Sequence, residues 1–249
     1  MIRCEQVAFS YDKTKEILKD ISFELDGGHF LALLGNNGAG KSTPLKCLNG
    51  IYRVSSGCVW VDKSEIQTLK RRQIAQSMAY VEQSSEASQF TVYDTVLMGR
   101  KPFIQTNPSD ENFLIVEKAI DRMQLRDFAL RYTDELSGGE LQKVIIARAL
   151  AQQHTILLLD EPTSNLDLYN QHEVMQLIQE IARQDHILVI VVIHDLNLAL
   201  RYCDRFLFMK DGLVYSYGDE STVTEKTIFD IYHVHARVLK EDGRTFVLV

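Results

Sequence analysis

Residues 35–43 combine a glycine-rich turn with a lysine and two hydroxyl groups. They follow an apolar run, Phe30 to Leu34, that has the length of a buried strand. After a strand, this pattern is typical of a phosphate-binding loop, because glycines let successive backbone N–H groups point at phosphate oxygens. Lys41 would supply a cation for the β and γ phosphates, and Ser42 a hydroxyl for Mg²⁺. The nucleotide-binding residues that we expect are Gly35, Asn36, Asn37, Gly38, Ala39, Gly40, Lys41, Ser42 and Thr43.

Pro44 is unusual at its position, because it falls in the first turn of the helix that should follow the loop. Its missing N–H is tolerated there, but a proline biases the residue before it away from helical dihedral angles. We therefore expect Thr43 to be locally strained or slightly displaced, with the phosphate site retained.

Two adjacent carboxylates, Asp160 and Glu161, follow a second apolar run, Ile156 to Leu159. At the end of a buried strand, Asp160 can hold the shell of a Mg²⁺ ion, and Glu161 can polarise an attacking water as a general base. An acidic pair at a solvated strand end is common by itself. Together with a phosphate loop, it favours nucleotide hydrolysis.

Three further side chains could serve this chemistry, although each has a simpler explanation. Gln83, after the strand-like Met78 to Val81, suits a contact with Mg²⁺ or the attacking water, but also an ordinary loop. His194 ends the apolar run Ile187 to Ile193 and could bond water and the γ-phosphate, or simply cap a helix. Tyr11 lies in a polar break and could stack on a purine ring, or be a surface tyrosine.

The pentapeptide Leu136-Ser-Gly-Gly-Glu predicts the start of a helix, because apolar residues recur at helical spacing after it. Ser137 and Glu140 have the spacing of a capping box. Gly138 and Gly139 lower helix propensity without improving the cap. They would, however, let an anion approach the N–H groups at the positive end of the helix. A capped helix explains the serine and the glutamate, whereas the glycines favour a second anion contact.

The elements that must position these residues follow an α/β pattern. Short apolar runs that suit buried parallel strands precede the phosphate loop, the acidic pair and His194, and a further run spans Phe206 to Met209. Alternation predicts strands at Ile2 to Ala8, with Ile2, Cys4, Gln6 and Ala8 on one face, and at Ile21 to Leu25.

Helical patterning dominates from about Thr91 to Gln153, with a polar interruption at residues 105–110. This stretch carries the Leu-Ser-Gly-Gly-Glu turn. Another amphipathic helix follows Asp167, and the end of the chain reads as a hairpin about Asp242-Gly243.

Composition suits a soluble globular protein, with 249 residues, 45% hydrophobic and 24% charged. A net charge of −7 argues against a dominant nucleic-acid surface. The four cysteines are scattered without a C-x-x-C pair, which favours reduced structural thiols. Because there is no signal-peptide core and no apolar run long enough to span a bilayer, we expect a cytoplasmic protein.

Taken together, the motifs resemble the ATP-binding cassette (ABC) ATPases over nearly the whole chain, in order and in spacing. Residues 35–43 are similar to the Walker A loop, Gln83 to the Q-loop, 136–140 to the signature motif, 156–161 to the Walker B strand, 164–167 to the D-loop, His194 to the switch histidine, and Tyr11 to the adenine-stacking aromatic. Pro44 and Glu82 depart from the family pattern, which commonly has an apolar helix former and a proline there.

The resemblance implies an α/β fold of the P-loop NTPase type, with an antiparallel β subdomain and an inserted α-helical subdomain. We expect one ABC domain over residues 1–249. Within it, we divide the chain into a nucleotide-binding core at 1–86 and 154–220, a helical subdomain at 87–153 and a C-terminal extension at 221–249.

The resemblance also implies ATP and Mg²⁺ as cofactors, with Ser42, Gln83 and Asp160 near the metal and with Glu161, His194 and Gln83 in catalysis. It further implies a head-to-tail dimer of two copies. In such a dimer, the ATP on one copy is closed over by the signature residues of the other, with its D-loop nearby. These residues are Ser137, Gly138, Gly139 and Glu140, and Asp167 of the D-loop.

A narrower resemblance lies in residues 91–103, which look like the start of the helical domain in importers of iron chelates, haem and cobalamin. In that subfamily, this region and the Q-loop form the groove that receives a cytoplasmic helix of the permease. It implies an ATPase on the inner face of the cell membrane that works with separate permease subunits and, indirectly, a substrate-binding protein.

Other classes of function share these motifs. A chromosome-maintenance ATPase would need a long coiled coil between the phosphate loop and the signature turn, and a ribosome-acting protein usually carries two cassettes. The chain has neither. An exporter ATPase and a nucleotide-binding module without hydrolysis remain alternatives, although Glu161 and His194 argue against the latter.

Overall fold

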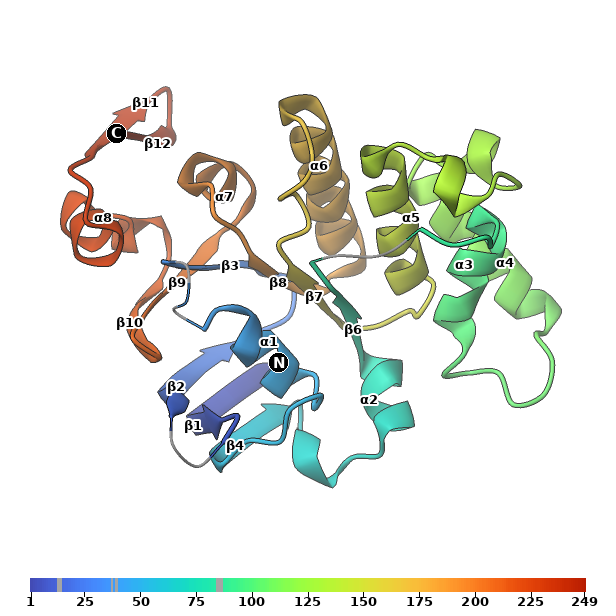
Figure 1. The fold of residues 1–249 in the computed structure, drawn as a ribbon, viewed down its shortest axis with the longest axis horizontal. Coiled ribbons are helices and arrows are strands. Elements are labelled where there is room, and N and C mark those ends of the chain that lie inside the picture. Colours follow the sequence, from blue (N-terminus) through green and yellow to red (C-terminus); the bar gives the residue numbers. More distant parts are fainter. Residues whose placement is uncertain (13–14, 37, 39, 84–86) are drawn as a thin grey trace.

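The computed structural model describes residues 1–12, 15–36, 38, 40–83 and 87–249. Its described strands form one large curled sheet, in the order β5-β4-β1-β2-β10-β9-β3-β8-β7-β6, and a separate two-stranded ribbon, β11-β12 (Figure 1). The large sheet has a parallel part and an antiparallel part. They join where Leu213 of β10 pairs with Asp20 of β2. The α/β fold class expected from the sequence is confirmed.

The parallel part of the sheet carries the predicted apolar strands. Each residue of β3, β7 and β8 is buried, as expected for strands covered on both faces. Strand β10 then turns back antiparallel to β9. The bounds are β3 (Phe30–Gly35), β6 (Met78–Val81), β7 (Ile156–Asp160), β8 (Leu188–Val192), β9 (Arg205–Lys210) and β10 (Leu213–Gly218).

Alternate residues of each parallel strand belong to two different hydrophobic clusters. In β3, Ala32 and Leu34 face the cluster under helices α5 to α8, whereas Leu31 and Leu33 face the cluster under α1 and the antiparallel strands. Figure 1 shows α5, α6 and α7 on one side of the strands and α1 on the other. The helix bounds are α1 (Ser42–Leu48), α5 (Gly138–Leu150), α6 (Leu168–Asp185), α7 (Leu196–Tyr202) and α8 (Glu225–Tyr232).

The antiparallel part of the sheet contains a bulge that the sequence pattern did not predict. The pairing of β1 with both neighbours shifts after Glu5, and Gln6 has φ +49°. Gln6 is therefore exposed while Val7 and Ala8 are both buried, so the expected common face of Ile2, Cys4, Gln6 and Ala8 is wrong beyond Cys4. A Cβ at Gly57 would lie 2.2 Å from the Gln6 carbonyl oxygen, so this close approach requires glycine. The strands are β1 (Ile2–Ser10), β2 (Glu16–Leu25), β4 (Ser56–Val61) and β5 (Ser64–Glu65).

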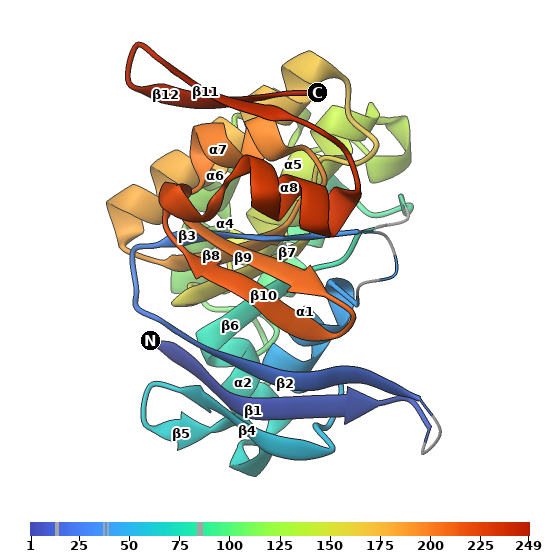
Figure 2. The same cartoon turned by 90° about the vertical axis from the view of Figure 1, so that its left-hand side faces the viewer.

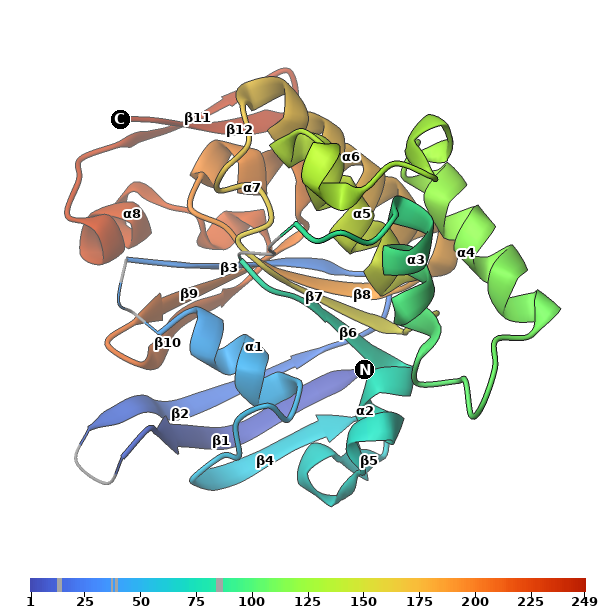
Figure 3. The ribbon, with the colours of Figure 1, turned by 45° about the vertical axis from the view of Figure 1, so that its right-hand side comes forward.

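The helical part packs beyond the β6 edge of the sheet, as Figure 3 shows. Its helices are joined by short 3-10 turns, and the predicted polar interruption leads into α4. A Cβ at Gly99 would lie 2.1 Å from the Arg148 carbonyl oxygen, so the chain after α3 meets α5 backbone to backbone. Besides α5, the helical part contains α3 (Val92–Leu97) and α4 (Asp110–Arg122), with the 3-10 turns η2 (Met98–Arg100), η3 (Arg126–Phe128) and η4 (Thr133–Glu135). Outside it, η1 (Ile66–Thr68) and α2 (Arg71–Ser77) lie before β6, and η5 (Glu220–Thr222) lies between β10 and α8.

The chain ends in the predicted hairpin, formed by β11 (Arg237–Glu241) and β12 (Arg244–Leu248). Figure 2 shows this ribbon lying over α7. The Asn197 side chain of α7 holds it there, because its amide group exchanges two hydrogen bonds with the backbone of Val247, at 3.0 and 2.8 Å.

The four cysteines are free, and Cys4, Cys47 and Cys203 are buried. Burial raises the pKa of Cys47 to about 12, so its thiol stays protonated and behaves as a small apolar side chain. Among the described residues, no helix combines the length and the apolar character that a bilayer crossing requires.

His154 is a buried histidine in the connection between α5 and β7, only 6% exposed. Its Nδ1 lies 3.0 Å from the Ala149 carbonyl oxygen, which can only accept, so Nδ1 carries the proton. Its Nε2 is buried without a hydrogen-bond partner among the described residues. Burial lowers the pKa of His154 to about 4, so the folded protein keeps this imidazole neutral.

This predicts an acid-sensitive stability. The pKa in the unfolded chain is about 6.5, so below that pH the unfolded state binds a proton that the folded state excludes. The stabilising contribution is complete above pH of about 6.5 and is lost progressively toward pH of about 4. His154→Phe should flatten the slope of unfolding free energy against pH by up to about 1.4 kcal/mol per pH unit. Urea titrations across this range measure it. His235→Phe, at an exposed histidine, is the control, and equal slopes for His154→Phe and the unaltered protein would contradict the prediction.

Candidate active site

The ends of four parallel strands meet at one edge of the sheet, and the residues that follow them line a common pocket of about 440 Å³. Carboxyl ends of parallel strands are where α/β proteins bind ligands. The structure therefore brings together residues from four separate sequence segments, as the motifs predicted. The lining residues are Gly38, Gly40, Lys41, Ser42, Thr43, Gln83, Glu161 and His194.

The glycine-rich loop joins β3 to α1 and carries a buried lysine. Gly38 and Gly40 have φ of +82° and +85°, a left-handed conformation that favours glycine. Lys41 is 6% exposed, and its Nζ donates to the carbonyl oxygens of Gly35 at 2.8 Å and Asn36 at 2.9 Å. Burial lowers the pKa of Lys41, against the opposing effect of Glu161 and Asp160. Two predicted loop residues, Asn37 and Ala39, lie outside the described residues.

Contrary to our expectation, Pro44 does not displace Thr43 from its place after the loop. Helix α1 runs without a break from Ser42, and Thr43 is its second residue, buried, with its N–H donating to the Gly40 carbonyl at 3.0 Å. Pro44 is the third helical residue, where an N–H has no intrahelical acceptor in any helix. The expected displacement of Thr43 is therefore wrong, and its side chain remains at the pocket.

Asp160 is a buried carboxylate, 3% exposed, at the end of β7. Its Oδ1 accepts from the Ser42 hydroxyl at 2.8 Å, and its Oδ2 accepts from the Tyr80 hydroxyl at 3.0 Å. Burial raises the pKa of Tyr80 far above its usual range, and the neighbouring Asp160 carboxylate raises this pKa further. The Tyr80 hydroxyl therefore stays protonated and remains a hydrogen-bond donor. Hydroxyl and carboxylate oxygens are ligands that Mg²⁺ prefers, so Ser42 and Asp160 fit that ion.

Tyr80 is a residue of the site that sequence reasoning missed. It lies in β6, next to β7, and its hydroxyl is the polar atom of an otherwise apolar four-residue strand. A polar atom in such a strand was the available signal, because it needs a buried partner.

Glu161 lies between the other two predicted catalytic side chains. Its Oε2 accepts from the Gln83 Nε2 at 2.7 Å, and its Oε1 lies 2.6 Å from the His194 Nε2. Its backbone has φ +50°, a conformation that costs a non-glycine residue about 1–3 kcal/mol. The Glu161 N–H donates to the Val192 carbonyl at 3.1 Å, which ties this turn to β8.

Tyr11 lies beside this pocket and is 62% exposed. Its hydroxyl is 3.4 Å from the Thr43 Oγ1. Its ring meets Phe9 and Tyr52 edge to face, with centroid distances of 5.0 and 5.4 Å. Tyr52 was not singled out from the sequence, and together the three rings form an aromatic cluster next to the loop.

The Leu-Ser-Gly-Gly-Glu turn is not among the residues that line this pocket. It begins α5 with the predicted capping box: Glu140 Oε2 accepts from the Ser137 N–H at 2.8 Å and from its hydroxyl at 2.7 Å. These bonds lower the pKa of Glu140. Ser137 and Gly138 are exposed, whereas Gly139 is buried.

The two glycines of this turn differ in their surroundings. A Cβ at Gly138 would have no described heavy atom within 4 Å. A Cβ at Gly139 would lie 2.5 Å from the Asn170 Oδ1, so a larger residue there would require the Asn170 side chain to move. Packing against the Asn170 side chain is therefore a second reason for a glycine at position 139, beside the expected anion contact.

The D-loop aspartate Asp167 caps the N-terminus of α6. Its Oδ1 accepts from the Asn170 backbone N–H at 2.8 Å and from the Asn170 Nδ2 at 3.0 Å. The next two residues, Leu168 and Tyr169, are 70% and 73% exposed. The capped turn therefore holds two large apolar side chains in solvent.

Comparison with known proteins points to one family. Residues 18–164 match the family model described as ABC transporter. An uncharacterized ABC transporter ATP-binding protein of Methanocaldococcus jannaschii is 48% identical over 96% of this chain and 93% of its own length. The iron(3+)-hydroxamate import ATP-binding protein of Bacillus subtilis is 35% identical over 97% and 90%. The cobalamin import ATP-binding protein of Halobacterium salinarum is 38% identical over 85% of this chain, which spans only 54% of that longer relative.

Two solved structures share the fold. One is an inward-facing metal-chelate type ABC transporter, with a TM-score of 0.85 and 30% identity over 99% of this chain and 95% of that one. The other is a dimeric ATP-binding cassette in a post-hydrolysis state bound to ADP and Pi, with a TM-score of 0.78 and 27% identity over 88% and 98%.

The fold and the pocket define a P-loop nucleotide hydrolase, with a phosphate loop, a buried acidic strand end and a polar cluster around Glu161. The family match covers more than half of the chain, and the relatives extend over nearly all of it. The chain belongs to the ABC transporter family, as an ATP-binding, ATP-hydrolysing cassette.

The bond from Tyr80 to Asp160 predicts a stability loss. Tyr80→Phe should lower the free energy of unfolding by about 1.5–3 kcal/mol, because a buried carboxylate loses a donor. Urea denaturation measures the change. Tyr169→Phe is the matched control, since Tyr169 is 73% exposed and the loss of its hydroxyl should cost little. Equal losses in the two variants would contradict the assignment.

Proposed function

We propose that this chain is the ATPase subunit of an importer that moves a metal chelate, of the iron-siderophore, haem or cobalamin type, through a separate permease. The observation that best supports hydrolysis is the position of Glu161, which lies between Gln83 and His194 at the pocket of the phosphate loop. The cargo class is supported by the names of the iron-hydroxamate and cobalamin relatives and by the metal-chelate type transporter that shares the fold. An exporter ATPase is the alternative.

In this proposal the pocket residues divide the chemistry of ATP hydrolysis. Lys41 and the loop N–H groups bind the phosphates, and Ser42 and Asp160 hold Mg²⁺, which neutralises phosphate charge when bound. Glu161 accepts a proton from the attacking water as general base. Gln83 and His194 orient the Glu161 carboxylate through the hydrogen bonds that they make with it, with Gln83 also near the metal. Tyr11 stacks on the adenine.

We further propose that two copies form the complete active site. The exposed Ser137 and Gly138 of the signature turn do not line the pocket of their own chain, so they are free to meet a nucleotide bound by another copy. Helix N-termini with bare N–H groups favour anions, which suits a γ-phosphate. Asp167 and the exposed Leu168 and Tyr169 would lie at the same interface. The dimeric cassette that shares the fold supports the pairing of two copies.

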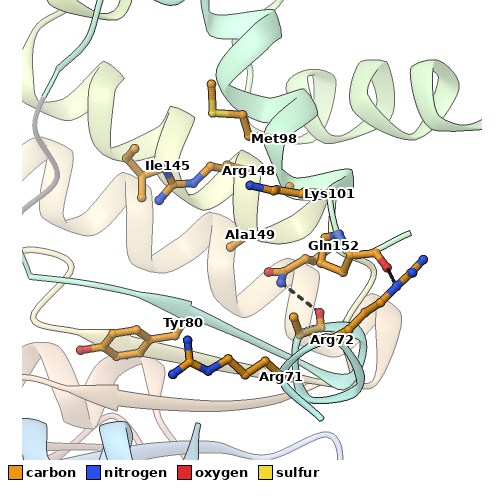
Figure 4. Close-up of a pocket in the computed structure, with 12 residues that line it drawn as sticks. Arg71, Arg72, Tyr80, Met98, Lys101, Ile145, Arg148, Ala149 and Gln152 are labelled. Atoms are coloured by element: carbon orange, nitrogen blue, oxygen red, sulfur yellow. Dashed lines mark hydrogen bonds between the residues drawn. The ribbon is translucent and has the colours of Figure 1, made fainter. Parts of the chain in front are cut away.

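The permease would bind in a basic groove of about 510 Å³ between α2 and the helical part. Figure 4 shows Arg71 of α2, Lys101 of the turn after η2 and Arg148 of α5 around one pocket. Burial lowers the pKa of Arg148, while Glu82, the residue that departs from the family pattern, acts in the opposite direction. Because the groove is rich in cations, the permease segment that enters it should carry a carboxylate.

In this proposal the division of the chain follows from the roles of its parts. Residues 1–86 and 154–220 bind the nucleotide, 87–153 carry the signature turn and one wall of the groove, and 221–249 form an extension. The chain lies on the cytoplasmic face of the membrane, where permease subunits hold it. A substrate-binding protein delivers the cargo to the permease and does not contact this chain. The net charge of −7 speaks against nucleic acid as a partner.

Glu161→Gln tests the hydrolytic role. The substitution keeps the size of the side chain but removes the general base, so ATP turnover should fall by about 10²-fold or more while ATP binding persists. Turnover of the purified protein, with tritium- or fluorescence-labelled ATP for affinity, measures both. Equal rates in the variant and the unaltered protein would sink the assignment.

Ser137→Arg tests the two-copy site. A bulky cation at the exposed signature turn should leave ATP binding to one copy intact and should abolish both turnover and ATP-dependent dimerisation. Size-exclusion chromatography measures the dimerisation. The Glu161→Gln protein is the comparison, because it should dimerise with ATP. Normal turnover in Ser137→Arg would show that the turn does not act on a nucleotide.

A further inference from the structure

We propose that Asn170 is a positioning residue, which sets the place of the signature turn (Ser137–Glu140) relative to the D-loop (Ser164–Asp167) within one chain. The contact that carries this proposal is independent of the two-copy site. Its consequence for turnover rests on the proposed function, because only there do both segments act on a nucleotide.

The Asn170 side chain is fixed at one end by the D-loop. Asp167 Oδ1 accepts from the Asn170 Nδ2 at 3.0 Å and from its backbone N–H at 2.8 Å. The other end of the amide abuts the signature turn. A Cβ at Gly139 would lie 2.5 Å from the Asn170 Oδ1 and 2.7 Å from its Cγ. Asn170 therefore fills the space that a side chain at position 139 would need.

A second contact repeats the first one turn further along both helices. Lys143 Nζ lies 2.7 Å from Glu173 Oε2, and these side chains are only 12% and 21% exposed. Residue 143 follows 139 by four positions and 173 follows 170 by three, so the two contacts lie on the facing sides of α5 and α6. A largely desolvated ion pair holds its geometry more strictly than a surface pair. Two successive contacts fix the relative orientation of the helices as well as their distance.

The sequence places these two segments far apart, and both present exposed residues. Ser137 and Gly138 are exposed at one helix start, and Asp167 and Leu168 at the other. A ligand or subunit that meets both at once binds well only if their spacing is already correct, because ordering them on arrival costs free energy. A displacement of about 1 Å at such a site can lower a rate by about 10²-fold. Asn170 supplies the spacing in advance.

The contact itself is tested by a double-variant cycle in melting temperature, with Gly139→Ala, Asn170→Ala and both together. Gly139→Ala alone should lower the Tm, because its methyl group meets the fixed Asn170 amide. In the Asn170→Ala background the same change should be neutral or raise the Tm, since alanine favours a helix and the space is now empty. Strictly additive effects of the two substitutions would overturn the contact.

The positioning role is tested by the turnover of Asn170→Ala. Its kcat should fall by about three- to tenfold while the KM for ATP stays within about twofold, because the phosphate loop is untouched. Gln176→Ala is the matched control, since Gln176 is an exposed residue further along the same helix and should keep normal turnover. Normal kcat in Asn170→Ala, or a rise in KM without a fall in kcat, would overturn the positioning role.

The two proposals fail in different ways. If Ser137→Arg turned over ATP normally, the two-copy site would be lost while the double-variant cycle would still report the contact. If the cycle were additive while Ser137→Arg were inactive, the two-copy site would stand and the role of Asn170 would be lost.

Discussion

Parallel pairing of β6, β7, β8 and β3 is the constraint on which the site depends. Because these strands run in the same direction, their carboxyl ends reach one edge of the sheet, and the chain must turn there four times. Each turn places polar residues next to a core that excludes water. The desolvated Lys41 and the buried Asp160 are consequences of that arrangement, since each is a polar group held where burial alone would disfavour it. At the same edge, Glu161 adopts a left-handed backbone conformation.

Much of this could be predicted from the sequence, because its signals are local. The phosphate loop, the acidic strand end and the capping box each lie within a few consecutive residues and follow a strand or precede a helix. The apolar runs of β3, β7 and β8 predicted buried strands correctly for the same reason. Even Gln83 and His194, which spacing alone left open, become specific once each is recognised as lying two residues beyond the end of a strand of the same sheet.

The remainder depended on contacts between distant segments. The bulge at Gln6 arises where Gly57 approaches it, and alternation along one strand carries no trace of that. Tyr80 joins the site through its hydrogen bond to Asp160, eighty residues later. The space beside Gly139 is filled by the Asn170 side chain, which belongs to another helix. Pro44 led to a wrong prediction for a different reason. A proline generally disfavours helical dihedral angles at the residue before it, but here burial of Thr43 and Leu45 in α1 outweighs that preference.

Helix α5 has a consequence that reaches beyond either of its ends. Its first turn carries the signature residues, its last turn carries Arg148 in the basic groove, and its thirteen residues span about 20 Å. Because the helix is uninterrupted, its two ends move together, and the backbone contact at Gly99 ties its last turn to the chain after α3. A protein that binds the groove more tightly in one orientation of α5 therefore shifts the signature turn toward the position that it has in that orientation. By thermodynamic reciprocity, a ligand at the turn changes the affinity of the groove by the same factor, so the energy transferred is equal in both directions.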